Sequence, residues 1–464
     1  MSGGGPADPG IGPAPPGPRA VLAVLVAATV LTAGTNTVMT VVLPEVGRDL
    51  GVGPVALSWT ATGPLLALAV TAPVYGVLGA RSGVRWLFAT GVGLFAIGSV
   101  TAALAPAIEV LLAARVVQGL GAGAVPALAG LVVVSTVPRH RRGAAFGVIA
   151  TGNGAAQAGG PAVGGVLAEL AGWRAMFVLA GVLAVPLLVA VVRVLPQRRS
   201  TEPAGGVDLL GAALLGTAVA AALAATGLRG GPGTGVLVPV AVLAAAGLVL
   251  RSATARHPFV PVALLRRPGY LAACVVAAVA LGTYLAAEVL VPLQVAALNG
   301  LGTGAIGWVL LPGAVLTVLV STPAGRIADR RGNRVVAATG TGALLGAAVL
   351  LSSGAGGHPA VVAAGMAVAG AGFAIVTVAA QNAAGLALDP AVAGAGMGLY
   401  QTAYFLAGAV GATTGTVVLA GRAGTPGSWN PLHDGPGADY ADALLLLVPV
   451  LLAGLAATAR LRRA

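Results

Sequence analysis

The side chain best suited to chemistry is an acid inside an apolar stretch. Glu288 lies in the segment LGTYLAAEVLVPLQV, with Tyr284 one helical turn before it and Pro292 one turn after it. An isolated carboxylate in hydrocarbon takes up a proton rather than stay charged. Glu288 is therefore a candidate for a protonatable coupling residue, or for the counter-ion of a cationic substrate. The alternative is a protonated Glu288 that bonds Tyr284 or a backbone carbonyl and serves packing only.

A second buried charge is predicted in the segment LLAARVVQGLGAGAVPAL. Arg115 shares one helical face with Gln118, Gly119, Ala122 and Pro126. A charge inside the bilayer is costly and usually faces a cavity or a partner, so we expect Arg115 to take part in proton coupling or to bind an anionic group. The alternative is an arginine near the end of the span whose charged head reaches the membrane surface.

Other polar side chains within apolar segments are candidates for the lining of a cavity. The alternative for each is a hydrogen bond that serves packing. Two pairs share a helical face, Asn153 with Gln157 and Tyr400 with Tyr404. A mostly apolar cavity with few polar groups suits amphiphilic or aromatic compounds. The predicted cavity residues are Asn36, Trp59, Gln118, Asn153, Gln157, Tyr284, Gln381, Asn382, Tyr400, Gln401 and Tyr404.

These residues must be positioned by helices that cross a membrane. The chain of 464 residues is 57% hydrophobic and 8% charged, with a mean hydropathy of +0.96. Soluble domains carry about 25% charged residues, and a span needs about 20 apolar residues. The sequence predicts about fourteen spans, at residues 20–43, 56–79, 86–105, 110–134, 143–168, 174–195, 208–228, 234–251, 270–293, 305–327, 335–353, 359–383, 394–420 and 441–459.

The arginines predict how these spans are oriented. All 25 basic residues are arginine; twenty fall beside one membrane face, four beside the other, and Arg115 within a span. Because short cytoplasmic loops collect basic residues, this bias places both termini in the cytoplasm. Contacts with lipid headgroups also account for the net charge of +12, and no nucleic-acid partner is expected.

Several classes of function are disfavoured by what the sequence lacks. Cys274 is the only cysteine and the four histidines show no ligand spacing, so neither a disulfide framework nor a metal site is expected. There is no Walker loop, which argues against ATP-driven transport by this chain alone, and no cofactor is expected. A membrane enzyme would need a clustered catalytic set, which the sequence does not offer.

Internal repetition predicts two related halves. The segment YGVLGARSGVRW follows the second span, and PAGRIADRRGNRVV follows the tenth. Similar loops eight spans apart favour six spans, two inserted spans and six more. The predicted division is a disordered cytoplasmic tail at 1–18, a bundle at 19–195, a linker at 196–206, two extra spans at 207–251, a cytoplasmic loop at 252–269 and a second bundle at 270–464.

The second of these loops resembles the signature loop of the major facilitator superfamily. Its matching residues are Gly325, Asp329, Arg330, Gly332 and Arg334, and the first copy offers Gly76, Arg81, Gly83 and Arg85, with Ala80 at the acidic position. The resemblance implies that Asp329 caps the neighbouring helix or pairs with an arginine across the interface between the halves. Such a latch favours one of two access states; the alternative is a plain basic turn.

The fifth span resembles the antiporter signature of exporters in this superfamily. The matching residues are Gly147, Gly160, Pro161, Gly164 and Gly165. Small residues let helices approach closely, and the alternative is generic glycine-mediated packing. The first span resembles that of fourteen-span drug–proton antiporters, closest to the Gram-positive tetracycline-type pumps, with Thr35 in place of their acid. Gln157 also stands where those pumps carry an acid, which disfavours a metal–tetracycline substrate.

This resemblance implies an all-α major-facilitator fold, with two six-helix bundles and two additional central spans. It implies a monomeric, multi-pass plasma-membrane protein of bacterial origin, with a small-molecule substrate, protons and membrane lipids as partners. The implied function is proton-coupled export of small hydrophobic or amphiphilic compounds such as antibiotics, by alternating access. The alternatives are a transporter of a specific endogenous metabolite, sugar or lipid, and a non-transporting membrane sensor or scaffold.

Overall fold

The structure is a computed structural model of the 464-residue chain. It describes residues 17–52, 54–197, 208–227, 234–255, 264, 266–389, 392–425 and 427–461. Within these residues the secondary structure is helical and contains no strand. Most of the predicted tail, most of the linker at 196–206, the turn between the two extra spans and much of the loop at 252–269 lie outside them.

The first bundle is built from long apolar helices joined by short turns. The predicted fourth span is interrupted at Gly123, which lies against Thr71 of the second helix, where a side chain would collide with that helix. The helices are α1 (Pro18–Leu50), α2 (Pro54–Ser82), α3 (Val84–Ala103), α4 (Ile108–Ala122), α5 (Ala124–Thr136), α6 (Arg142–Ala171) and α7 (Arg174–Val194), with a 3-10 turn η1 (Arg139–Arg141) before α6.

The second bundle repeats this construction, and two helices separate the bundles in the sequence. The separating helices, α8 (Leu209–Gly227) and α9 (Thr234–Thr254), pack on each other, and α8 also contacts both bundles. The second bundle contains α11 (Pro268–Asn299), α12 (Thr303–Arg331), α13 (Asn333–Ser353), α14 (Pro359–Ala387), α15 (Ala393–Arg422), α16 (Ala438–Leu445) and α17 (Leu447–Thr458).

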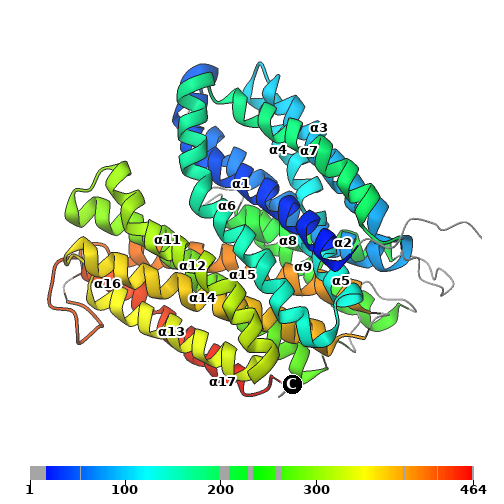
Figure 1. Ribbon diagram of the computed structural model, residues 1–464. Helices are drawn as coiled ribbons and strands as arrows, with labels where there is room; N and C mark the ends of the chain where they lie inside the picture. The colour runs from blue at the N-terminus through cyan, green and yellow to red at the C-terminus, as the bar shows by residue number, and fades with distance from the viewer. Residues whose placement is uncertain are drawn as a thin grey trace, which may run out of the picture.

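Equivalent helices pair in the same way in both bundles. In the first, α1 packs on α6, α2 on α4 and α3 on α7; in the second, α11 packs on α15, α12 on α14 and α13 on α17. The bundles meet through α6 against α12 and through α2 against α15 (Figure 1). The predicted all-α fold of two bundles with additional helices between them is thereby confirmed.

Eleven helical segments of the described residues are long and apolar enough to cross a membrane. Helices α2, α6 and α8 fall outside this group. Glycines and amides such as Asn153 and Gln157 lower the hydropathy of α6, while the apolar stretches of α2 and α8 are shorter, at 63–79 and 213–222. The count of fourteen spans therefore stays a prediction.

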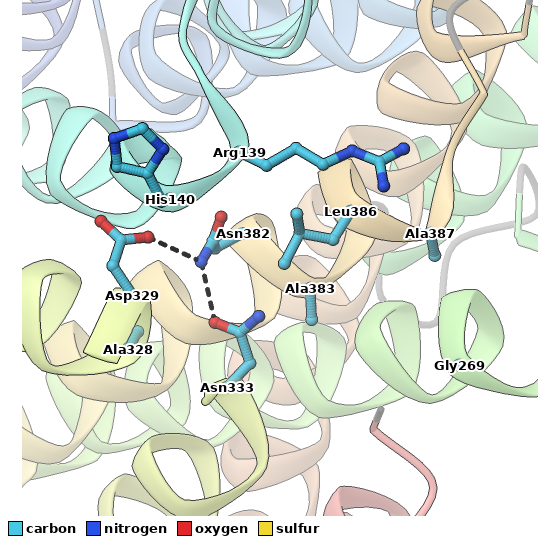
Figure 2. Close-up of a pocket in the computed structure, with 10 residues that line it drawn as sticks. All are labelled: Arg139, His140, Gly269, Ala328, Asp329, Asn333, Asn382, Ala383, Leu386 and Ala387. Atoms are coloured by element: carbon cyan, nitrogen blue, oxygen red, sulfur yellow. Dashed lines mark hydrogen bonds between the residues drawn. The ribbon is translucent and has the colours of Figure 1, made fainter. Parts of the chain in front are cut away.

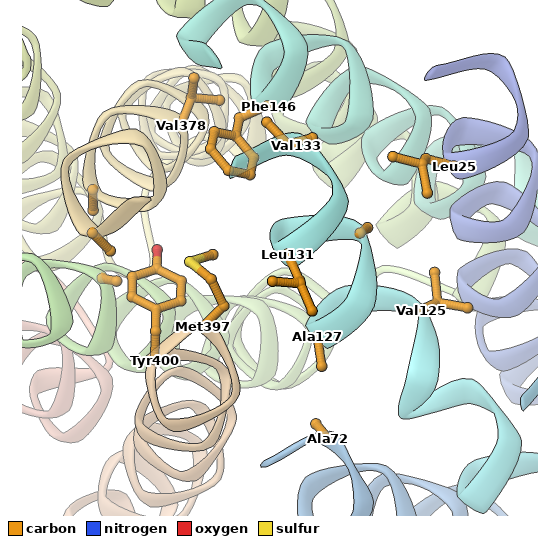
Figure 3. Packing of buried hydrophobic residues seen from close by; sticks show 14 of the residues in the cluster. Leu25, Ala72, Val125, Ala127, Leu131, Val133, Phe146, Val378, Met397 and Tyr400 are labelled. Carbon is orange, nitrogen blue, oxygen red and sulfur yellow. The ribbon is translucent and has the colours of Figure 1, made fainter. Parts of the chain in front are cut away.

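The hydrophobic core differs between the two ends of the molecule. We define the basic end as the one that carries the turns α2–α3, α5–α6 and α12–α13, which are rich in arginine. There a single core joins both bundles, with Leu131 and Phe146 from the first and Val378 and Met397 from the second (Figure 3). At the opposite end, one cluster belongs to the first bundle alone and another to the second alone. The bundles are packed together at the basic end and parted at the other.

Large apolar side chains also cover the outside of the molecule. On α7, Val178, Val182 and Val185 are 53%, 61% and 60% exposed. A soluble protein rarely exposes such a continuous apolar surface, whereas lipid accepts it without cost. The outer surface therefore suits a membrane.

Candidate functional site

Arg115 lies inside the first bundle, on α4, and its guanidinium bonds to three groups. Nε donates to the backbone carbonyl of Thr60 on α2 at 3.0 Å. One terminal nitrogen donates to Oε1 of Gln118 at 2.8 Å, and the other to Oδ1 of Asn36 on α1 at 2.9 Å. Gln118 in turn donates to the Ser99 hydroxyl on α3 at 2.8 Å. This Arg115 network joins α1, α2, α3 and α4.

The Arg115 network is enclosed by protein. Arg115 and Gln118 are each 1% exposed, and the ring centre of Phe177 lies 6.0 Å from Cζ of the guanidinium. The three acceptors are neutral, and no carboxylate of the described residues pairs with Arg115. Because a buried charge is costly unless it is hydrogen-bonded, these oxygens stabilise the cation. Its burial excludes the alternative of a charged head at the membrane surface.

A second polar site lies in the other bundle, around Glu288 on α11. The hydroxyl of Tyr284, one turn earlier, lies near the Glu288 carboxyl and near the Thr317 hydroxyl of α12. The Tyr284 ring stacks on Phe373 of α14, with 4.3 Å between ring centres and 6° between planes. Glu288 is half-buried and forms no ion pair with a described basic residue. The carboxyl thus lies beside aromatic and hydroxyl groups without a cation.

Two tyrosines continue this site along α15. The rings of Tyr404 and Tyr400 are stacked, with centres 6.3 Å apart and 10° between planes. Tyr404 lies near Thr377 of α14 and near the carboxyl of Glu288. Tyr400 is 1% exposed, with its hydroxyl directed toward the helix that carries Val378, so it is enclosed rather than open to a cavity (Figure 3). We define the aromatic site as Tyr284, Glu288, Thr317, Phe373 and Tyr404.

The two sites are not in contact. The hydrogen-bond partners of Arg115 all belong to the first bundle, and the neighbours of Glu288 all belong to the second. The other predicted cavity residues lie apart and form no hydrogen bond with the described residues: Trp59, Asn153, Gln157 and Gln381, which are half-buried, and Gln401, which is buried. A shared cavity lined by all of them stays a prediction.

At the basic end, Asp329 of α12 holds the start of α6. Its carboxylate accepts the backbone N–H groups of Gly143 and Ala144, both at 2.8 Å. The first N–H groups of a helix have no partner inside it and favour a negative charge, so Asp329 caps a helix of the other bundle. The Asn382 amide nitrogen donates to Asn333 at 3.0 Å and lies 3.4 Å from Asp329 (Figure 2). No described arginine bonds to Asp329.

Glycines allow the bundles to approach closely at this end. Gly325 of α12 lies against the backbone of Gly143, so that a side chain at either position would collide with the other helix. Gly147 lies in the same way against Ser321 of α12. On the other side of the interface, Gly76 of α2 lies against the backbone of α15. These contacts and the Asp329 cap together form what we call the latch.

The remaining glycines of α6 serve its own bundle. Gly160 and Gly164 face α1, where they lie against Thr37 and Val38. Gly165 has no neighbour within 4 Å of the place where a Cβ would be. The antiporter-like stretch therefore packs α6 on α1 through two of its glycines.

The two signature loops share a backbone requirement. Gly83 and Gly332 have φ angles of 94° and 86°, which side chains disfavour, so glycine is needed at both turns. Arg85 donates from Nε to the carbonyl of Leu195 at 2.6 Å and ties the first loop to the end of α7.

Two other predicted motif residues add no contact to the latch among the described residues. Arg330 is exposed and Arg334 is half-buried, and neither bonds to the described residues. The side chains of Arg81 and Pro161 lie outside the described residues.

Several residues of these sites were not predicted. An asparagine directly after Gly332 is a signal for a helix start that could have pointed to one of them. The others are single hydroxyls or aromatics in apolar helices, which look like packing residues in a sequence. They are Thr60, Ser99, Thr317, Asn333, Phe373 and Thr377.

Comparison with known proteins identifies the family. Residues 25–412 match the Major Facilitator Superfamily. The chain is 28% identical over 425 residues to the tetracenomycin C resistance and export protein of Streptomyces glaucescens, covering 89% of this chain and 78% of that protein. It is 27% identical over 307 residues to the lincomycin resistance protein LmrB of Bacillus subtilis, covering 64% of each. The chain therefore belongs to the Major Facilitator Superfamily, as predicted, and is a multi-pass membrane protein of a transporter family.

A solved structure supports the same fold. The human organic anion transporter MFSD10 (TETRAN) matches with a TM-score of 0.69 over 95% of this chain and 99% of that chain, at 16% sequence identity. At this identity the likeness concerns the arrangement of helices alone.

Proposed function

We propose that the protein is a proton-coupled exporter of small hydrophobic or amphiphilic compounds, such as antibiotics, that works by alternating access. Relatives named for tetracenomycin C export and lincomycin resistance support the export of such compounds. The observation that carries the proposal is Glu288, a half-buried acid that lies beside aromatic rings and hydroxyls without a basic partner among the described residues.

Glu288 is the coupling residue in this proposal. In apolar surroundings a carboxyl is stable either when protonated or beside a cation. When Glu288 takes up a proton, the affinity of the protein for substrate falls, and when the proton leaves, the affinity is restored. Arg115 is a positioning residue: it is enclosed, and its network joins four helices, with α3 reached through Gln118.

The aromatic site favours flat or amphiphilic substrates. Tyr284, Phe373 and Tyr404 bring aromatic rings together from three helices, and Glu288 and Thr317 add few polar groups. Aromatic pairs gain about 0.5–1.5 kcal/mol beyond the area they bury, so a ring system in this site is stabilised without specific hydrogen bonds. This composition suits a pump that accepts several related compounds.

Alternating access uses the difference between the two ends. Because short cytoplasmic loops collect arginine, the basic end and both termini face the cytoplasm in this proposal. A core shared at the basic end and divided at the other corresponds to an outward-facing state. The latch must separate before the cytoplasmic side opens, and it re-forms when Asp329 recaps α6.

The test is proton movement in inverted membrane vesicles, followed with a pH-sensitive dye while a panel of amphiphilic drugs is added. We expect drug-dependent proton release from the wild-type vesicles and its loss in Glu288→Gln. Glu169→Gln is the matched control, because Glu169 is an exposed acid at the far end of α6. Transport with intact proton dependence in Glu288→Gln would refute the assignment.

A further inference from the structure

Of the eight buried polar atoms that lack a protein partner among the described residues, all of them in the second bundle, three lie between Glu288 and the basic end. They are Oγ1 of Thr377, the hydroxyl of Tyr400 and Oδ1 of Asn382. Buried polar atoms in proteins nearly always have a hydrogen-bond partner, and buried water commonly supplies it. Each atom can accept a hydrogen bond, and the two hydroxyls can also donate one.

The helices place these atoms between Glu288 and the basic end. Helix α14 runs toward the basic end, so Thr377 and then Asn382 follow Phe373 of the aromatic site in that direction. Helix α15 starts at the basic end, so Tyr400 lies one turn closer to it than Tyr404. We call the unpaired atoms of Thr377, Tyr400 and Asn382 the orphan atoms. They lie one after another between the aromatic site and the basic end, on α14 and α15.

The last of these atoms, in Asn382, lies at a cavity of about 370 Å³ at the basic end. Its lining includes Asn382, Asn333 and Asp329 from the second bundle and Arg139 and His140 from η1 of the first. Asn382 and Asn333 are only 1% and 2% exposed. Figure 2 shows the free oxygen of Asn382 pointing away from its two bonded neighbours, toward the space between His140 and Arg139.

We propose that water held by Thr377, Tyr400 and Asn382 relays the coupling proton between Glu288 and this cavity. The proton thus leaves through the second bundle, separately from the substrate, which moves between the bundles. Each hydroxyl or water accepts one proton from the Glu288 side and donates one to the next, so no relay atom changes its net charge. This inference rests on the proposed role of Glu288.

The charged groups around the two ends of the relay fit this direction. Near Glu288 the titratable neighbours are Tyr284 and Tyr404, which offer hydroxyls and no fixed charge. At the cavity, His140 lies beside Asp329, and the Arg139 side chain extends away from Asp329 along the lining, above Leu386 (Figure 2). While the bundles are packed, the Arg139 cation opposes the arrival of a proton, and separation of the latch withdraws η1 from the cavity. Proton release is therefore linked to opening of the basic end.

The described residues of the first bundle offer no comparable relay. There Arg115, Gln118, Asn36 and Ser99 bond to one another or to backbone carbonyls. None of these side chains has an orphan buried atom. A proton relay needs groups that can exchange partners, and a closed network of this kind holds its partners fixed.

The test compares net transport with exchange in proteoliposomes, using a drug that the wild type exports. Net efflux driven by a proton gradient requires proton release at the basic end, whereas exchange of labelled for unlabelled drug at equal pH does not. Tyr400→Phe and Thr377→Val remove one hydroxyl each without breaking a described protein hydrogen bond, so both variants should fold. Tyr270→Phe is the matched control, because that hydroxyl donates to the Gly396 carbonyl at 2.6 Å.

We expect Tyr400→Phe and Thr377→Val to slow net efflux on the order of tenfold, as for the loss of a positioned proton-transfer group, and to leave exchange unchanged. Tyr270→Phe should leave the ratio of net efflux to exchange the same as in the wild type. Wild-type rates in both relay variants, or an equal fall in net efflux and exchange, would overturn the relay while leaving the exporter proposal standing. A wild-type protein that exchanges drug without moving protons would instead overturn the coupling role of Glu288 and the relay with it.

Discussion

Arg115 in the first bundle and Glu288 in the second are both ionisable side chains within apolar helices, yet their surroundings are opposite. Arg115 is 1% exposed and bonds to three neutral oxygens from three helices. Glu288 is half-buried beside tyrosines, and orphan hydroxyl and amide atoms continue from it toward the basic end. Two bundles with the same helix pairing therefore hold a fully hydrogen-bonded cation in one and, in the other, an acid without a basic partner among the described residues.

This difference indicates that the two bundles have different roles. A saturated network resists rearrangement, because breaking it leaves buried acceptors without donors. Aromatic stacking and unpaired hydroxyls tolerate small changes in position and can exchange partners with water or substrate. We infer that the first bundle acts as the rigid body and that the second carries most of the chemistry.

The largest expected effect comes from removing the fixed charge. Arg115→Met should lower the free energy of unfolding by about 2–5 kcal/mol, because Asn36, Gln118 and the Thr60 carbonyl lose their shared donor in a buried site. The measurement is denaturant unfolding of the purified protein in detergent. Tyr400→Phe serves as the contrast and should unfold within about 0.5 kcal/mol of wild type. If both variants unfolded alike, the proposed division between the bundles would be wrong.

An intermediate effect is expected from the aromatic site. Phe373→Leu removes the stacking partner of Tyr284, worth about 0.5–1.5 kcal/mol, and should raise the KM for an aromatic drug several-fold. The number of protons moved per drug should not change, since Glu288 is retained. Phe95→Leu is the control, because Phe95 is 2% exposed in the core of the first bundle. An equal rise in KM in both variants would mean that the stack contributes only to general packing.

The smallest effect is expected at a surface ion pair of the first bundle. Arg174 and the indole N–H of Trp173 bond to Asp49 at 2.6 and 3.1 Å, and these hydrogen bonds hold the pKa of that carboxyl below its ordinary value of 3.8. Its contribution to stability is therefore complete above that value and is lost as the pH falls through the lowered pKa. Exposed pairs contribute little, so Asp49→Asn should barely change the melting temperature at pH 7.

The pH dependence sharpens this last prediction. The small difference in melting temperature between wild type and Asp49→Asn should shrink further as the pH is lowered below the ordinary value of 3.8. The melting temperatures of Asp49→Asn and Arg115→Met can also be compared directly at pH 7. If both variants melted equally far below the wild type, the first bundle would be stabilised from its surface rather than from its buried network.

The sequence by itself determined the membrane class, the family and the two most informative side chains. Hydropathy over 20-residue windows depends on composition alone, and the glycine and arginine pattern of the signature loops is local, so both can be read without a fold. The isolation of Glu288 and Arg115 in apolar stretches was visible for the same reason.

Only the tertiary structure decided what those side chains meet. It placed Asn36 and the Thr60 carbonyl on Arg115, Phe373 on Tyr284, and Asp329 on the first turn of α6 in the other bundle. It also showed Asn382 at a basic-end cavity rather than beside the aromatic site. Helix rotation and crossing decide such contacts, and both arise from close packing between segments far apart in the sequence. A pattern within one segment fixes which face is polar, but not which neighbour that face will meet.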